Sequence, residues 1–195
     1  MSNVSNTADD ILNCARLLVA SGGYNGFSYA DISDVVGIRK ASIHHHFPSK
    51  VDLVRALVAR HREQAEAGLT EMASHLPDPA DQLRAYTDHW AACVADSTMS
   101  FCICALLASE LPVLPPQVAT EVKAYFRGLS MWLTGVMKRG ARNGSLVLGN
   151  EPQTEAETFM ATVHGAMLSA RAYGDPSVFR LVTEPLLARL APVRH

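Results

Sequence analysis

Hydrogen-bond donors suited to nucleic acid are concentrated in one stretch of the chain, between Phe27 and Lys50. They comprise two cations, a hydroxyl and three consecutive imidazoles: Arg39, Lys40, Ser42, His44, His45 and His46. Arginine and lysine donate to guanine edges and to phosphate oxygens, and a serine hydroxyl can either donate or accept. Side chains of these types at this spacing predict contact with double-stranded DNA.

The distribution of charge favours the same interpretation. Six lysines and arginines and one acid, Asp52, lie between Gly37 and Arg62, whereas the whole chain has a formal net charge of −2. A basic segment on an otherwise acidic chain is typical of a DNA-reading part joined to a part that does not touch DNA. The alternative is an ordinary solvated surface that happens to be basic.

Local signals in this stretch indicate two short helices joined by a tight turn. Ser28 is suited to cap the first helix, and Asp31 places negative charge near the positive end of that helix. Gly37 can adopt the positive φ that a sharp helix exit often needs. Residues 39–46 then form a second helix, with Ile43 directed toward a core. Helix, glycine turn and polar second helix follow the plan of a helix-turn-helix motif.

The segment from Thr7 to Leu53 resembles the N-terminal domain of TetR-family transcriptional repressors. The likeness is carried by ILNCARLLVASGGYNGFSYADISDVVGIRKASIHHHFPSKVDL, and its most specific part is IRKASIHHHFPSK. This sequence departs from the family pattern at His44, where the family usually has tyrosine. The resemblance implies a DNA-binding regulator that is not an enzyme.

The resemblance implies two groups of DNA-binding residues, at the positions of this sequence that match the family's DNA contacts one by one. Base edges are expected to meet the N-terminal end of the second helix, through Arg39, Lys40, Ala41, Ser42 and His45. Phosphates are expected to be held by Ser28, Tyr29, His44, His46 and Lys50, which fix the register on the duplex.

The rest of the chain predicts further helices and no strands. We expect helices over residues 49–72, 80–96, 101–111, 116–143, 153–173 and 176–190, with breaks at Leu76-Pro77-Asp78-Pro79, Pro112 to Pro116 and Asn143-Gly144. The fold class is therefore all-α, with about nine helices. A helix-turn-helix domain is expected over residues 5–65 (motif 28–47), and a ligand-binding and dimerisation domain over residues 76–195.

Composition argues against other classes of protein. The N-terminal MSNVSNTADD lacks the basic and apolar regions of a secretion signal, and no apolar run is long enough to cross a membrane, which predicts a cytoplasmic protein. The four cysteines show no metal-ligand spacing, and adjacent imidazoles on a helix point about 100° apart, so neither a metal nor a cofactor is expected. A small helical enzyme is the alternative class, but neither a Ser/His/Asp order nor a phosphate-binding loop is present.

A second group of residues could line an effector pocket in the C-terminal part. These are Trp90, Cys102, Met131, Phe159, His164, Met167 and Arg171. For the methionines and aromatic residues, ordinary core packing is the alternative. The position of Cys102 resembles that of the sensing cysteine in electrophile-responsive members of the family, in the branch of the N-ethylmaleimide reductase repressor. A helix N-terminus lowers the pKa of a thiol, whereas a buried cysteine acts simply as a small apolar residue.

Together these features predict a homodimeric repressor that releases a palindromic operator when a small effector binds. The helix-turn-helix domain, here called the head, reads too few base pairs when it acts alone. Two heads can read half-sites on successive turns of DNA. The last two helices are the expected interface, with Ala156, Met160, Ala166 and Ala170 permitting close approach. The alternatives are a thiol-based electrophile or redox sensor acting through Cys102, a ligand-independent DNA-binding protein, and an activator with the same head.

Overall fold

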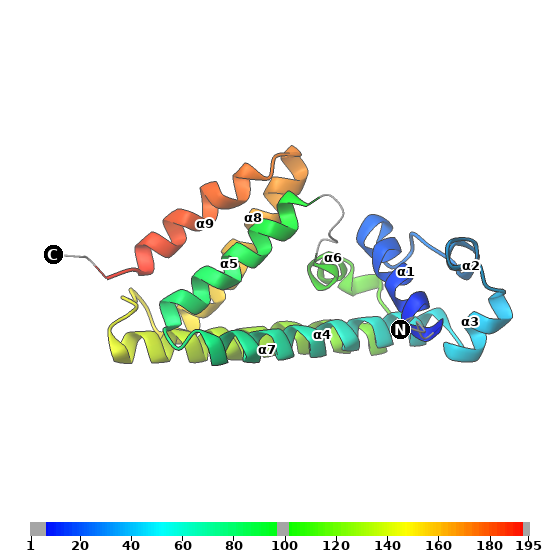
Figure 1. Cartoon of the computed structure of the whole chain (residues 1–195), viewed down its shortest axis with the longest axis horizontal. Coiled ribbons are helices and arrows are strands. Elements are labelled where there is room, and N and C mark those ends of the chain that lie inside the picture. Colours follow the sequence, from blue (N-terminus) through cyan, green and yellow to red (C-terminus); the bar gives the residue numbers. More distant parts are fainter. Residues whose placement is uncertain (1–6, 97–101, 193–195) are drawn as a thin grey trace, which may run out of the picture. The chain divides into compact units, whose positions relative to one another are not determined.

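The computed structural model describes residues 7–96 and 102–192, and in these ranges it contains α-helices, one 3₁₀ turn and no strand (Figure 1). The elements are α1 (Thr7–Gly22), α2 (Tyr29–Val36), α3 (Lys40–His46), α4 (Lys50–His75), α5 (Pro79–Ala95), α6 (Ile103–Ser109), η1 (Leu111–Val113), α7 (Pro116–Asn143), α8 (Pro152–Tyr173) and α9 (Ser177–Leu190). The predicted all-α fold with nine helices is confirmed for the described residues. The residues before Thr7 in the predicted first domain, and residue 101 in the predicted 101–111 helix, lie outside them.

Helix α2 begins and ends where its sequence signals place it. The Ser28 hydroxyl accepts from the backbone N–H of Ala30, and the Asp31 carboxylate accepts from the N–H of Ser28, which completes a capping box. Gly37 ends the helix at φ 74°, in the left-handed region that glycine adopts without strain. These two residues fix the turn that leads into α3.

Helices α1 to α3 surround a small apolar core. Ile11, Ala15 and Val19 face it from α1, Ile32 from α2 and Ile43 from α3, and all five are fully buried. A helix as short as α3 has little stability of its own, so its position depends on this packing. The core therefore determines which side of α3 faces outward.

Contacts divide the described residues into two compact units. The first contains residues 7–64 and 102–125, and the second contains 65–96 and 126–192. Helices α4 and α7 each contribute to both units. Residues 102–125, which the sequence assigns to the C-terminal domain, thus pack with the helix-turn-helix.

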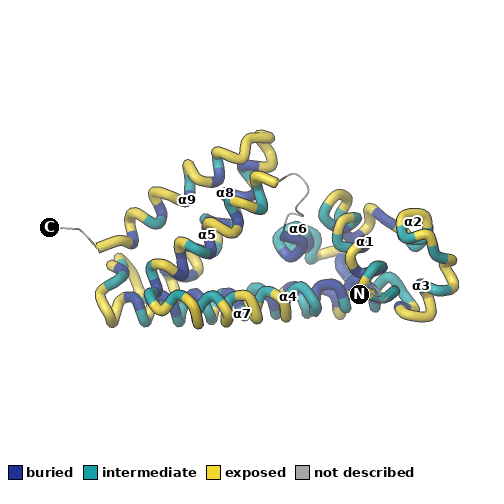
Figure 2. Tube along the Cα trace, viewed as in Figure 1, coloured by how far each residue is buried: buried dark blue, intermediate teal, exposed yellow. Residues whose placement is uncertain are grey.

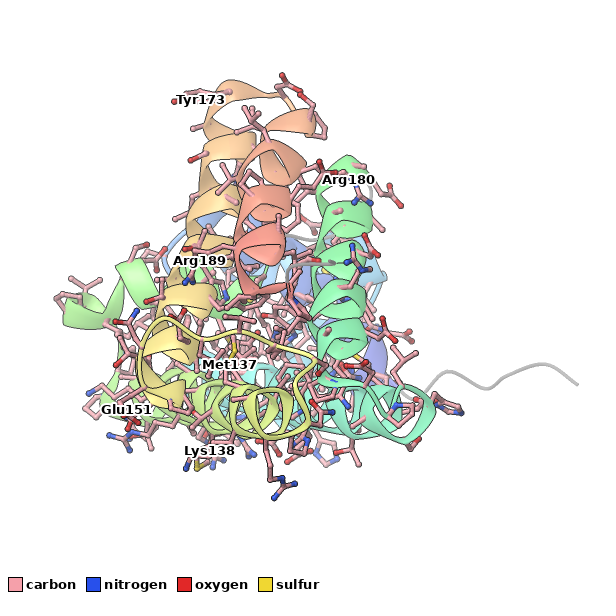
Figure 3. The ribbon with its side chains drawn as sticks, turned by 90° about the vertical axis from the view of Figure 1, so that its left-hand side faces the viewer. Met137, Lys138, Glu151, Tyr173, Arg180 and Arg189 are labelled. Carbon is pink, nitrogen blue, oxygen red and sulfur yellow. The ribbon has the colours of Figure 1, made fainter. Side chains whose placement is uncertain are left out.

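In the second unit, α8 and α9 form an antiparallel hairpin that turns at Gly174 and packs beside α5. Glu155 on α8 is almost fully buried and pairs with Arg189 on α9, at 2.6 Å between Oε2 and Nη2. Figure 3 shows Arg189 between these two helices, and Tyr173 at the opposite end of α8 from Glu151. Ala156, Ala166 and Ala170 are buried within the chain. These three alanines are therefore not available to a partner, and that part of the interface prediction is wrong.

Across the described parts of the chain, every helix is too short or too polar to cross a membrane.

Candidate functional site

The exposed face of α3 holds the residues predicted to read bases. Arg39 stands at the N-cap position with extended backbone, and Lys40 and Ala41 follow in the first turn; all three are exposed. Figure 2 shows much of α3 in the colour of exposed residues. Ser42 is partly exposed, and Ile43 faces the core. The N-terminal end of α3 therefore presents two cations and a methyl group to the outside, which suits insertion into the major groove.

Two of the residues predicted to hold phosphates have structural contacts of their own. Ser28 uses its hydroxyl in the α2 cap, although it remains exposed. Tyr29 donates its phenolic O–H to the Phe47 carbonyl at 2.8 Å, and its ring lies 4.7 Å from that of His44. Burial is the main cause that raises the pKa of Tyr29 to about 12. Tyr29 thus ties the start of α2 to the end of α3.

The three histidines lie at the C-terminal end of α3 and are all exposed. His44 Nδ1 is 3.1 Å from the Pro48 carbonyl oxygen, which can only accept, so this nitrogen carries the proton. The His45 and His46 rings meet edge to face at 5.5 Å. All three remain accessible to a DNA backbone.

Lys50, the fifth predicted phosphate ligand, is directed into the head. Its ammonium donates to the Phe27 carbonyl and lies 4.2 Å from the Phe27 ring centroid and 5.1 Å from that of Tyr24. Burial lowers the pKa of this ammonium, and the negative charges of Asp31 and Glu110 oppose that change. Lys50 therefore stabilises the loop before α2, a role that sequence reasoning did not anticipate.

Two other members of the basic segment have acidic partners in the same unit. Arg60 lies 3.3 Å from Asp9 of α1, and Arg62 lies 3.4 Å from Glu121 of α7. The basic surface of the head is thus narrower than the count of lysines and arginines suggests. Its exposed cations are Arg39, Lys40 and Arg55.

Cys102 lies in the first unit, against two residues that sequence reasoning did not select. Its sulfur is 3.9 Å from His61 Nε2 on α4 and 3.7 Å from the Tyr125 hydroxyl on α7, and the residue is 1% exposed. Burial, with a smaller effect from the charge of Arg16, lowers the pKa of His61 to about 4. The imidazole is therefore neutral at neutral pH and supplies no positive charge to a thiolate.

The second unit brings Trp90 and Phe159 together around Tyr86. The Tyr86 ring centroid is 6.4 Å from that of Trp90, 6.3 Å from that of Phe159 and 5.9 Å from that of Trp132. These rings come from α5, α7 and α8. Tyr86 and Trp132 were not among the predicted pocket residues, although Trp90 of α5 and Met131 of α7 were.

The other predicted pocket residues of the second unit lie in different surroundings. His164 donates from Nδ1 to the Met160 carbonyl at 2.9 Å and faces the Phe126 ring at 5.3 Å, while burial lowers its pKa. Met167 is buried, Met131 is 70% exposed and Arg171 is exposed. The structure therefore does not gather all the predicted residues around one cavity.

Met131 lines an open groove of about 510 Å³ between α7 and α8. Phe126 and Met160 form its apolar walls, and Ser130 donates to Glu157 Oε1 at 2.5 Å across it. The groove is thus a surface feature with a hydrogen bond that links the two helices.

Comparison with known proteins agrees with this arrangement. Residues 11–57 match the family model "Bacterial regulatory proteins, tetR family", and residues 79–186 match "Tetracyclin repressor-like, C-terminal domain". The chain belongs to the TetR family of transcriptional regulators. As a member of this family it is a helix-turn-helix DNA-binding regulator and not an enzyme.

Individual relatives span nearly the whole chain. A crystal structure of a TetR-family transcriptional regulator from Agrobacterium tumefaciens is 60% identical, with a TM-score of 0.93 over 95% of this chain and 97% of that one. YvkB of Bacillus subtilis strain 168, an HTH-type transcriptional regulator, is 23% identical over 85% of this chain and 83% of its own length. The reduced form of Escherichia coli NemR is also 23% identical, with a TM-score of 0.87 over 96% and 99% of the two chains. At that identity the likeness to NemR shows the fold alone.

Proposed function

We propose that this protein is a homodimeric, cytoplasmic repressor that releases a palindromic operator when a small effector binds its C-terminal unit. The observation that carries the proposal is the exposed N-terminal end of α3, with Arg39 and Lys40 outward and Ile43 in the core. Cations at this end of a reading helix can donate to guanine in the major groove.

Exposed apolar residues on the last two helices support a dimer. Leu168 and Tyr173 on α8 and Leu181 on α9 are 48%, 74% and 72% exposed in the single chain. Large apolar side chains on neighbouring helices favour burial against a second copy. Two copies place two reading helices on one duplex, with half-sites about 34 Å apart.

Helix α4 supports the effector response. It runs without interruption from Lys50, beside the reading helix, to His75 in the second unit. A ligand that favours a different tilt of this helix changes the separation of the two heads. Coupling of this kind is commonly worth about 1–3 kcal/mol, or a 5- to 150-fold change in affinity.

The test is a gel-shift titration with the DNA upstream of the protein's own gene, repeated in the presence of candidate effectors. We expect a dimer–DNA complex that at least one compound dissociates. Tight DNA binding that no metabolite, drug or thiol reagent changes would identify a ligand-independent DNA-binding protein. Loss of transcription on deletion of the gene would identify an activator.

The second candidate function is thiol sensing through Cys102, favoured by the contact of its sulfur with His61 and Tyr125. An adduct there would add volume inside a packed core and strain α4 through His61. Burial of the thiol and the neutral state of His61 weigh against rapid reaction. If Cys102 is the sensor, N-ethylmaleimide lowers operator affinity and Cys102→Ser abolishes that response while uninduced binding is retained. Equal sensitivity of the wild type and the Cys102→Ser variant to N-ethylmaleimide would exclude Cys102 as the sensor.

A further inference from the structure

Both tryptophans of the chain lie in the aromatic cluster of the second unit. Trp90 on α5 and Trp132 on α7 flank the ring of Tyr86, at 6.4 and 5.9 Å between centroids. Phe159 of α8 completes the cluster at 6.3 Å from Tyr86. Three helices thus direct flat apolar surfaces toward one place.

The two indole nitrogens in this cluster lack acceptors. Nε1 of Trp90 and Nε1 of Trp132 are buried, and within residues 7–96 and 102–192 neither has a hydrogen-bond partner. An indole N–H can only donate, and a buried one usually finds an acceptor because leaving it unpaired is costly. Both of these donors belong to rings that flank Tyr86.

We propose that this cluster is the effector site and that its ligand is a neutral, planar aromatic compound bearing a carbonyl oxygen. This inference rests on the proposed effector response. The rings supply faces for stacking, and the indole N–H groups require an acceptor on the ligand. Trp132 keeps partial solvent exposure although its nitrogen is buried, so a ligand can reach the cluster from its side.

The local charge favours a neutral ligand over an anion. Arg139 of α7 donates from its guanidinium to Oε1 of Gln82 at 2.9 Å, and Gln82 lies one turn of α5 before Tyr86. Gln82 in turn donates to the Leu76 carbonyl at 2.6 Å and is 2% exposed. The guanidinium of Arg139, which is partly buried, is thus bonded to a buried amide and is already paired.

Isothermal titration of the full-length protein with three matched probes tests this assignment. The probes are 2-acetonaphthone, 2-ethylnaphthalene, which has the same shape without an acceptor, and 2-naphthoate, which carries a charge. We expect 2-acetonaphthone to bind about tenfold tighter than 2-ethylnaphthalene, because it satisfies a buried donor. Trp90→Phe and Trp132→Phe keep an aromatic ring and remove one N–H each, so at least one of them should reduce this ratio by about threefold or more. The control variant Lys138→Gln, at an exposed position of α7, should leave the ratio unchanged.

Equal affinity for the ketone and the hydrocarbon would overturn the inference, as would a ratio that neither tryptophan variant changes. Tighter binding of 2-naphthoate than of the ketone would overturn the neutral ligand class. Operator binding is measured separately on the same samples. If the ketone binds as predicted without releasing DNA, the ligand class stands and the proposed effector response fails. If other compounds release DNA while the ketone does not bind, the response stands and the ligand class fails.

Discussion

The backbone N–H of Tyr24 donates to the carboxylate of Glu110, at 2.9 Å from Oε2. Tyr24 lies just after α1, whereas Glu110 directly follows α6, 86 residues further along the chain. Gly23 precedes Tyr24 with φ 70°, and a Cβ at Gly23 would overlap Glu110 Oε1. The shape of the turn and the position of the carboxylate therefore depend on each other.

Removing the Glu110 carboxylate should make the helix-turn-helix domain less stable. We expect Glu110→Ala to lower the free energy of unfolding by about 1–2 kcal/mol, because the Tyr24 N–H loses its acceptor. Glu110→Gln keeps an amide oxygen in place and should cost less. Hydrogen–deuterium exchange at the Tyr24 amide gives a direct readout, and it should be fastest in Glu110→Ala. Unchanged exchange in both variants would show that the bond does not hold the turn.

The helix-turn-helix could be predicted from the sequence because its determinants are local. The Ser28 cap, the Gly37 turn and the inward position of Ile43 each depend on residues within one or two turns. The Glu110 contact could not be predicted in this way, since it joins segments that only the folded chain brings together. The same reason explains why Lys50 was assigned to phosphate and not to the Phe27 carbonyl.

The residues of the proposed effector site were predicted less completely. Trp90 and Phe159 were selected as aromatic residues on helical faces, and the structure places both beside Tyr86. Arg171 and Met131 belong to the same predicted group, yet both are exposed. Helical periodicity indicates which residues share a face of one helix, but not which neighbouring helix that face meets.

Lys50→Ala should act mainly through the stability of the head. The ammonium bonds to the Phe27 carbonyl and lies over two rings, so its loss should lower the free energy of unfolding by about 1–2 kcal/mol. Affinity for all duplexes should then fall by a similar factor. Urea unfolding checks the first effect, and an unchanged free energy would contradict the internal role. A flatter salt dependence of binding would show that the ammonium also reaches a phosphate.

Lys40→Ala provides the matched comparison, since Lys40 is exposed at the start of α3. We expect it to leave stability nearly unchanged and to alter which DNA sequence is preferred. Loss of a good base contact costs about 1–3 kcal/mol of discrimination at one position. Binding-site selection from a random library measures this, and an unchanged preferred sequence would exclude a base-reading role.

His61 should make the first unit less stable in mild acid. Burial and Arg16 lower its folded-state pKa to about 4 from the ordinary 6.5. The unfolded chain therefore binds a proton more readily between these values, so stability falls as the pH drops below about 6.5. At pH 5.5 the loss is about 1 kcal/mol relative to pH 7.5. Urea unfolding at both pH values should show a smaller difference for His61→Leu than for the wild type, and equal differences would contradict the assignment.

Glu155 should contribute strongly to the α8–α9 hairpin. Its carboxylate accepts from Arg189, Asn150 and the Gly149 backbone, and the Arg189 hydrogen bond is the main cause that lowers its pKa to about 2. Glu155→Ala leaves these donors without their acceptor and should lower the free energy of unfolding by about 2 kcal/mol, since the half-exposed Arg189 can regain water. Chemical denaturation measures the loss. Glu184→Ala, an exposed site on α9, serves as the control and should stay within about 0.5 kcal/mol of the wild type.

A hydroxyl-radical footprint on the DNA upstream of the protein's own gene tests the central claim most directly. We expect two protected half-sites on one face of the duplex, with centres about 34 Å or a multiple of one turn apart, read by the α3 helices of a dimer. Protection should be lost in a protein that carries both Arg39→Ala and Lys40→Ala and still unfolds at the wild-type denaturant concentration. Undiminished protection by that variant would contradict the assignment of α3 as the reading helix.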